Sequence, residues 1–296
     1  MTKFLTPLLP TNLTRPASRF FGPGSTHHII RDQLPLPTWL ALGALAQSAL
    51  YALLGRLAFT PAFLLISFYA LDTYAQAMGW KRNRAMQGVL AGKTTAVFPD
   101  RDSSAQQPAK HGVVVLLLGT RCNHPLGMFA PGFQQSGAYF QSMAASLDAH
   151  AEEFGYLGMS TYMNINDRSA KSELVNLAYF RSLEGLHAFA HSEYHMGAWR
   201  WWNGTFKQHP HLSIWHEIFE APSGGWEGVY VNSSVTGLLA TSVKVPGEEA
   251  WRSPVVDAGR GGVLKTSKGR MGRSEGLEHK RVEGADVYER LGEEKV

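Results

Sequence analysis

The residues most able to do chemistry lie in the run 179–206, which is dense in histidine and tryptophan. His187, His191 and His195 recur every four residues, so a helix would place them along one flank. Imidazoles titrate near neutral pH and can act as general bases or metal ligands. Over a continuous helix, however, the first and third would stand roughly 12 Å apart, too far to share one metal ion. We therefore predict no metal site and favour His195 as the base of this run.

A second residue of this kind is His216, in the run 211–220, where apolar and other residues alternate as in a strand. Its side of the strand is otherwise aliphatic, with Leu212, Ile214 and Ile218. We expect a buried His216 that faces the helices, either as a core histidine bonded to a backbone carbonyl or as a general base. The opposite side carries Trp215, Glu217 and Phe219. There we expect Glu217 to pair with Arg121 or with a group of a partner chain.

Two polar residues follow the first predicted strand, 113–119: Arg121 and Asn123. Side chains at the end of a strand can reach the mouth of a pocket, which makes both candidates for contact with a substrate. Asn123 also suits a turn before Pro125, and this plainer interpretation stays open. Cys122 is the single cysteine of the chain, so a disulfide framework is excluded, and we expect it to pack.

Aromatic side chains crowd the same region and predict a site for a flat, apolar ligand. The candidate substrate-binding residues are His191, Tyr194, Trp199 and Trp202. An ordinary core with a dimer contact would have the same composition, so that alternative stays open. Tyr230 lies in a short strand predicted at 226–232 and is assigned a structural or pairing role. This strand could pair with a partner subunit.

The elements that must position these residues follow from the apolar periodicity. Strands are predicted at 113–119, 156–164, 173–180 and 211–220, with helices at 136–154 and within 179–206. Ser182 is the expected N-cap of the second helix, and Gly204 is its expected end. The resulting order, β-α-β-β-α-β, is that of a ferredoxin-like domain, so the predicted fold class is α+β.

Residues 36–80 are apolar and carry only two charged side chains, Arg56 and Asp72. Each half approaches the roughly 20 residues that a membrane-spanning helix needs. Basic residues on both flanks favour a helical hairpin with both flanks in the cytosol. We therefore predict a membrane protein, with the endoplasmic reticulum as the expected location and the catalytic domain facing the cytosol. One span followed by a buried or interfacial helix, or two core helices of a soluble protein, are the alternatives.

Composition divides the chain into five segments. They are an N-terminal segment at 1–35, the apolar helical hairpin at 36–80, a linker at 81–111, the ferredoxin-like catalytic domain at 112–242 and a flexible polar tail at 243–296. The tail is rich in Gly, Lys, Arg and Glu and poor in large apolar residues, which is typical of disorder. The net charge is +4, without a basic run that interleaves with aromatics, so we expect no nucleic-acid partner.

Four segments carry a resemblance to a known family: GTRCNHP at 119–125, YFRSLEGLHAFAHSEYH at 179–195, IWHEIFEAPSGGWEGVYVNS at 214–233 and TGL at 236–238. They are similar to the monooxygenase-like dimeric α/β-barrel proteins related to antibiotic-biosynthesis monooxygenases, in particular to a fungal, membrane-anchored branch of the fumagillin-cluster type. The resemblance implies a homodimer in which ferredoxin-like units pair through their sheets. Each unit would hold a pocket between sheet and helices.

The resemblance and the residues together lead us to expect a membrane-anchored monooxygenase. Its substrate would be an apolar polyketide or terpenoid intermediate of fungal secondary metabolism. His195 or His216 would remove a proton, and the resulting anion would react with oxygen. Arg121 and Asn123 would stabilise developing negative charge. By the resemblance, Asn123 also matches a polar residue that orients substrate or oxygen.

Relatives include both cofactor-independent oxygenases and haem-using enzymes, so fold alone does not settle the reaction. Alignment with the haem-degrading relatives places Trp199 where their axial ligand stands, and an indole N–H cannot bind iron. No nucleotide-binding motif is present. We predict no cofactor, with haem as the main alternative. The alternative functions are a cyclase or dehydratase that uses the same pocket, and a non-catalytic membrane scaffold or binding protein.

Overall fold

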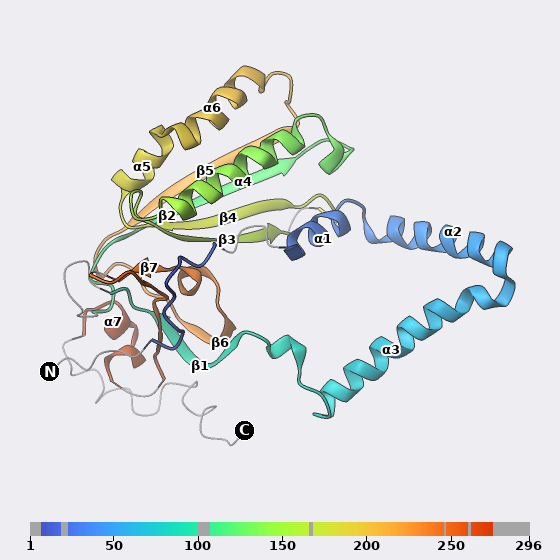
Figure 1. Ribbon diagram of the computed structural model, residues 1–296, viewed down its shortest axis with the longest axis horizontal. Helices are drawn as coiled ribbons and strands as arrows, with labels where there is room; N and C mark the ends of the chain where they lie inside the picture. Colours follow the sequence, from blue (N-terminus) through green and yellow to red (C-terminus); the bar gives the residue numbers. More distant parts are fainter. Residues whose placement is uncertain are drawn as a thin grey trace.

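A four-stranded antiparallel sheet forms the centre of the domain, with helices on one of its faces (Figure 1). The computed structural model describes residues 7–18, 23–99, 107–165, 168–245, 247–259 and 262–274. The strands lie in the order β3-β4-β2-β5: β2 (Val113–Cys122), β3 (Tyr156–Asn164), β4 (Glu173–Phe180) and β5 (Leu212–Ala221). Helix α4 (Phe133–Ala149) connects β2 to β3. Along the chain β2, α4, β3 and β4 follow one another in the predicted order, and the predicted bounds of β3 and β4 are confirmed.

The histidine-rich run forms two helices and not the single helix predicted: α5 (Leu183–His191) and α6 (Glu193–Thr205). Ser192 separates them because its backbone is extended, with φ −74° and ψ 159°. Its hydroxyl donates a hydrogen bond to the carbonyl oxygen of Phe189 at 2.7 Å. The histidines on the two sides of Ser192 therefore do not share one helical row.

The two ends of this run follow the capping rules in part. Ser182 caps α5 as predicted, since its Oγ accepts a hydrogen bond from the N–H of Gly185 at 3.2 Å. Gly204 does not end α6, which continues to Thr205. The helix runs on because Phe206 keeps helical backbone angles, and its N–H bonds to the carbonyl of Trp202.

The opposite face of the sheet is covered at one end by a second sheet of the same chain (Figure 1). Its strands lie in the order β6-β1-β9: β1 (Val89–Ala96), β6 (Tyr230–Ser234) and β9 (Val255–Asp257). Leu157 and Tyr179 of the main sheet pack there against Phe98, Leu239 and Val255. β6 pairs with β1 on one side and is the outer strand of this sheet, so its pairing with a partner subunit stays a prediction. The predicted linker also contains β1 and the buried Phe98.

The segment after residue 243 forms regular structure within residues 243–245, 247–259 and 262–274, contrary to the flexible tail that we predicted. It contains β7 (Val243–Lys244), β8 (Trp251–Arg252), β9, the 3-10 turn η5 (Val263–Lys265) and α7 (Ser267–Arg270). Several of its apolar residues are buried, among them Val255 and Leu264. Arg270 is buried too, and its Nε bonds to Glu227 at 2.8 Å. Residues 275–296 of the predicted tail lie outside the described residues.

Residues 7–18 lie along the domain and are held by one buried arginine. Arg15 donates hydrogen bonds to the carbonyl oxygens of Leu157 at 3.0 Å and Ser242 at 3.2 Å. Its Nε forms an ion pair with Asp148 at 3.2 Å. The N-terminal segment is therefore part of the catalytic domain, although the hairpin separates the two along the chain.

Two apolar helices project from the domain as an open V (Figure 1). They are α2 (Leu36–Leu54) and α3 (Thr60–Ala77), joined by the 3-10 turn η1 (Gly55–Phe59) and preceded by α1 (Pro23–Arg31). Every residue of α2 is at least partly exposed, while α3 buries Asp72. Asp72 forms ion pairs with Lys81, at 2.9 Å, and with Arg84. By length and composition, the stretch Leu36–Ala77 is able to cross a membrane.

Candidate active site

A cavity of about 730 Å³ lies between the sheet and helices α4, α5 and α6. Aliphatic side chains form its wall on the sheet, among them Leu116, Leu118, Ile214 and Ile218. Aromatic and aliphatic side chains of the helices form the opposite wall, among them Phe140, Leu147 and Phe189. The size and the apolar lining suit a small organic molecule with few polar groups.

His195, the base that we predicted, lies in the first turn of α6 and lines this cavity. It is half-buried, and its Nδ1 has no hydrogen-bond partner among the described residues. Burial lowers the pKa of His195 because it disfavours the charged form, and positive charge on His191 and His216 lowers it further. The carbonyl of Ala190 partly offsets these effects. The imidazole is therefore mostly neutral at pH 7 and able to accept a proton.

His216 lines the same cavity from the sheet, where it lies opposite Leu118 of β2. The predicted alternation is confirmed, because its aliphatic neighbours on that side also line the cavity: Leu212, Ile214 and Ile218. The prediction that His216 is buried is wrong, since β5 is an edge strand and leaves its side chains exposed. His195 and His216 thus line one cavity, and charge on His216 is the smallest of the causes that lower the pKa of His195. The structure thus brings the two candidate bases together.

The two polar residues at the end of β2 are separated. Arg121 lines the cavity, whereas Asn123 does not. Asn123 is exposed, and its Oδ1 accepts a hydrogen bond from Arg168 at 3.0 Å. Its backbone N–H bonds to the carbonyl of His211 at 2.6 Å and so extends the pairing of β2 with β5. The structure therefore favours the plainer interpretation of Asn123 as a residue that ends a strand.

Only two of the four predicted substrate-binding residues line the cavity. Trp199 and Trp202 line the cavity, whereas His191 and Tyr194 do not. Tyr194 packs on His150, with ring centroids 4.6 Å apart. His191 is exposed, and its Nδ1 lies 2.8 Å from a backbone carbonyl oxygen of α5. Each of the two helices contributes one histidine to the cavity wall, His187 from α5 and His195 from α6.

Sequence reasoning missed two groups of lining residues. His187 and Trp201 belong to the histidine-rich run, and Trp201 packs on Tyr139 with ring centroids 5.4 Å apart. The aromatic crowding of the run could have indicated Trp201. A second group comes from distant segments: Ile29, Asp32, Gln33, Lys171 and Ser172. No local pattern connects those segments with the cavity.

Glu217 and Tyr230 lie away from the cavity. Glu217 is exposed on the opposite face of β5, and no ion pair joins it to another described residue. The OH of Tyr230 accepts a hydrogen bond from the N–H of Leu238 at 3.2 Å, which ties β6 to the 3-10 turn η4 (Gly237–Ala240). Tyr230 therefore has the structural role predicted for it within its own chain.

Metal ligands are not grouped in the part of the chain that the structure describes: no three His, Cys, Asp or Glu side chains there could hold one ion. The three imidazoles of the cavity wall, His187, His195 and His216, come from three different elements. That the protein works without haem or another cofactor stays a prediction.

The comparisons with known proteins define the class of this protein as a monooxygenase, an oxidoreductase. Residues 113–238 match the Monooxygenase af470-like family. The chain is also 33% identical to Monooxygenase af470 of Aspergillus fumigatus in an alignment of 288 residues that covers 93% of this chain and 100% of that protein. The chain belongs to the Monooxygenase af470-like family.

Solved structures show more distant likenesses. SnoaB, a cofactor-independent oxygenase from Streptomyces nogalater, is 13% identical, and the match covers 36% of this chain and 90% of SnoaB with a TM-score of 0.26. A dimeric protein of unknown function with a ferredoxin-like fold, from Bacteroides fragilis, is also 13% identical. That match covers 36% of this chain and 95% of the other, with a TM-score of 0.25.

Proposed function

We propose that this monooxygenase is membrane-anchored and oxidises an apolar polyketide or terpenoid intermediate of fungal secondary metabolism without a cofactor. The single observation that carries the proposal is the environment of the His195 imidazole. This imidazole combines a lowered pKa with an unbonded Nδ1 in an apolar cavity. A neutral imidazole held in such surroundings is a general base. The apolar walls limit the substrate to a largely apolar molecule.

The chemistry balances without an external reductant when the substrate carries an acidic methylene group. His195 removes one proton from the CH₂ group, and the carbanion forms a C–O bond with O₂ to give a peroxide anion. This anion recovers the proton from His195 to give a hydroperoxide, which loses water and leaves a ketone. One oxygen atom of O₂ enters the product, and the other leaves as water. Arg121, on the cavity wall, would stabilise the negative charge of the carbanion and the peroxide.

The hairpin of α2 and α3 would hold the enzyme in the membrane in which an apolar substrate dissolves, with the domain in the cytosol and the endoplasmic reticulum as the expected location. Support comes from the exposed apolar surface of both helices and from the ion pairs that neutralise Asp72. The full-length chain should stay in the membrane pellet after an alkaline carbonate wash. Its release as intact protein would contradict the anchoring.

A second copy of the chain would cover the free part of the sheet. Trp215, Glu217 and Phe219 lie on the face opposite the helices, and 54% of Phe219 is exposed. The second sheet of the same chain covers part of that face as far as Val115, the β2 partner of Phe219, and leaves Phe219 itself exposed. An apolar patch of this kind on a sheet is suited to a homodimer contact.

Oxygen consumption by the purified full-length protein tests the proposed reaction. Apolar pathway intermediates are supplied in detergent micelles, with air, without oxygen and with ¹⁸O₂. The expected result is one ¹⁸O atom in the product and a rate that falls about 10²–10⁴-fold in His195→Gln. His150→Gln is the matched control, because His150 lies outside the cavity and should leave the rate unchanged. Equal turnover without oxygen would instead indicate a cyclase or dehydratase, and binding without turnover a scaffold protein.

A further inference from the structure

One end of the cavity is formed by residues that directly precede the membrane hairpin. Ile29, Asp32 and Gln33, at the end of α1 and just after it, line the cavity wall. Helix α2 begins at Leu36, three residues after Gln33. Three residues of extended chain span only about 10 Å. This end of the cavity is therefore tied closely to the start of the hairpin.

Hydrogen bonds fasten the end of α1 to two loops of the domain. The carboxylate of Asp32 accepts hydrogen bonds from the N–H of Ser172 at 2.5 Å and from its hydroxyl at 2.9 Å. The side-chain oxygen of Gln33 accepts one from the N–H of Met128 at 2.8 Å. Ser172 belongs to the loop between β3 and β4, and Met128 belongs to the 3-10 turn η3 (Gly127–Phe129). The three segments thus form one unit around this end of the cavity.

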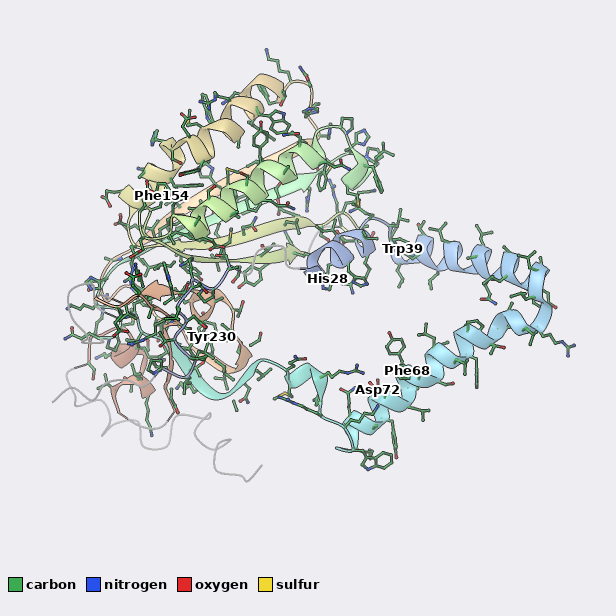
Figure 2. The ribbon with its side chains drawn as sticks, viewed as in Figure 1. His28, Trp39, Phe68, Asp72, Phe154 and Tyr230 are labelled. Atoms are coloured by element: carbon green, nitrogen blue, oxygen red, sulfur yellow. The ribbon has the colours of Figure 1, made fainter. Side chains whose placement is uncertain are left out.

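Trp39 fixes the position of this unit relative to α2. It lies in the first turn of α2, and its indole N–H donates to the carbonyl of Arg31, the last residue of α1, at 2.9 Å (Figure 2). Tryptophan at the end of a membrane-spanning helix lies at the level of the lipid headgroups. With the hairpin inserted, the end of α1 and the cavity wall beside it would therefore lie at the membrane surface.

The same three segments expose large apolar side chains. These side chains, which we call the rim, are Ile30 at 47% exposed, Leu126 at 56%, Phe129 at 69% and Ile165 at 76%. Basic side chains occur in the same segments: Arg31, Arg168 and Lys171. Apolar tips beside basic residues are typical of protein surfaces that insert into the interface of a membrane with anionic headgroups. In Figure 1, α1 and the loop before α4 lie on the side of the domain from which the hairpin projects.

We propose that the rim inserts into the lipid bilayer, so that the α1 end of the cavity faces the membrane and an apolar ligand enters the site directly from it. This inference rests on the proposed membrane anchoring and goes beyond it. An anchor alone only tethers the domain, whereas the rim sets the orientation of the cavity relative to the lipid. The partner of this surface is the membrane itself, and the ligand never has to cross water.

Spin labels on the full-length chain test this orientation. The chain is reconstituted in nanodiscs of phosphatidylcholine and phosphatidylserine, with the buried Cys122 replaced through Cys122→Ala. Labels are attached at Phe129→Cys and, as an independent rim position, at Ile165→Cys. Val263→Cys is the matched control, since Val263 is also an exposed apolar residue, at 44%, but belongs to η5 on the other sheet. Relaxation enhancement is then measured with oxygen, which concentrates in lipid, and with a water-soluble nickel chelate.

We expect both rim labels to respond more to oxygen than to nickel, and the label at 263 to show the reverse. Rim labels that respond like the control, in a chain that floats with lipid vesicles, would overturn the inference and leave the anchoring intact. A chain that fails to float with vesicles would contradict the anchoring, and the inference with it. The two failures are therefore distinguished by flotation alone.

Discussion

Trp215 on β5 donates a hydrogen bond from its indole N–H to Oε1 of Glu173 on β4 at 2.7 Å, across the intervening strand β2. The indole passes directly over Gly119 of β2, where an added Cβ would lie 2.0 Å from the ring. The other carboxylate oxygen of Glu173 accepts a hydrogen bond from Asn164 on β3 at 3.0 Å. The open face of the sheet thus carries a bonded row that spans all four strands.

Gly119→Ala should displace Trp215 and break this row, because the new methyl group and the indole cannot occupy the same space. Overpacking of this kind costs about 1–3 kcal/mol of the free energy of unfolding. Unfolding by denaturant in mild detergent, followed by tryptophan fluorescence, measures the loss. Gly197→Ala is the matched control, since nothing lies within 4 Å of an added Cβ in α6. It should be neutral or stabilising, and equal stability of the two variants would contradict this packing.

Phe219→Glu should weaken the homodimer, because it places a charge in the apolar patch that a second copy would cover. An increase of tenfold or more in the dissociation constant, about 1.4 kcal/mol, is expected. Sedimentation of the full-length protein in detergent measures the change. Phe206→Glu is the matched control, since Phe206 is 48% exposed but lies just after α6, on the helical side of the sheet. A wild-type protein that sediments as a monomer would contradict the dimer.

The ferredoxin-like domain could be predicted from the sequence because its strands show their periodicity locally. β3 and β4 were found with their observed bounds, and the side of β5 that faces the cavity was found from alternation alone. The break at Ser192 could not be predicted, since serine is also compatible with the interior of a helix. His191, Tyr194 and Asn123 lie outside the cavity, so three of the eight candidate catalytic and substrate-binding residues were misplaced.

His191→Gln should shift the pH dependence of catalysis while leaving the cavity wall intact. His191 lowers the pKa of His195 by its positive charge, so its removal should raise that pKa. The base must be neutral to act, and the acid limb of kcat/KM should therefore lie below about pH 6.5 in the wild type. In His191→Gln this limb should move to higher pH, with the plateau unchanged. A limb that stays in place, or moves to lower pH, would contradict the assignment of His195 as the base.

Arg15→Ala should destabilise the domain although it lies in the N-terminal segment. Its guanidinium is buried, pairs with Asp148 and lies 5.1 Å from the ring centre of Tyr156. Removal of one partner from a buried ion pair costs about 3–5 kcal/mol. Arg200→Ala removes an exposed ion pair, in which the side chain of Arg200 is 57% exposed and that of Glu193 82%. This substitution should lower the free energy of unfolding by less than about 1 kcal/mol. Denaturant unfolding of both variants checks this, and a similar small loss in each would contradict the structural role of residues 7–18.

The packing of both ends of the chain could not be predicted, because it depends on contacts between distant residues. Arg15 bonds to Leu157 and Ser242, which are 142 and 227 residues away in the sequence. The segment after residue 243 looks polar on average, yet Val255 and Leu264 are buried by other parts of the chain. Asp32 and Gln33 reach the cavity for the same reason, through bonds to distant loops. Average composition does not show which few residues will find such partners.

Anaerobic hydrogen exchange tests the central claim, that His195 removes a proton from carbon before oxygen reacts. The substrate identified by the oxygen-consumption assay is incubated with the enzyme in D₂O without oxygen. Deuterium in the recovered substrate is then measured by mass spectrometry. We predict exchange at the methylene carbon with the wild type and with His150→Gln, and a loss of about 10²–10⁴-fold with His195→Gln. Exchange at the same rate in His195→Gln, or none above the solvent rate in the wild type, would contradict the account.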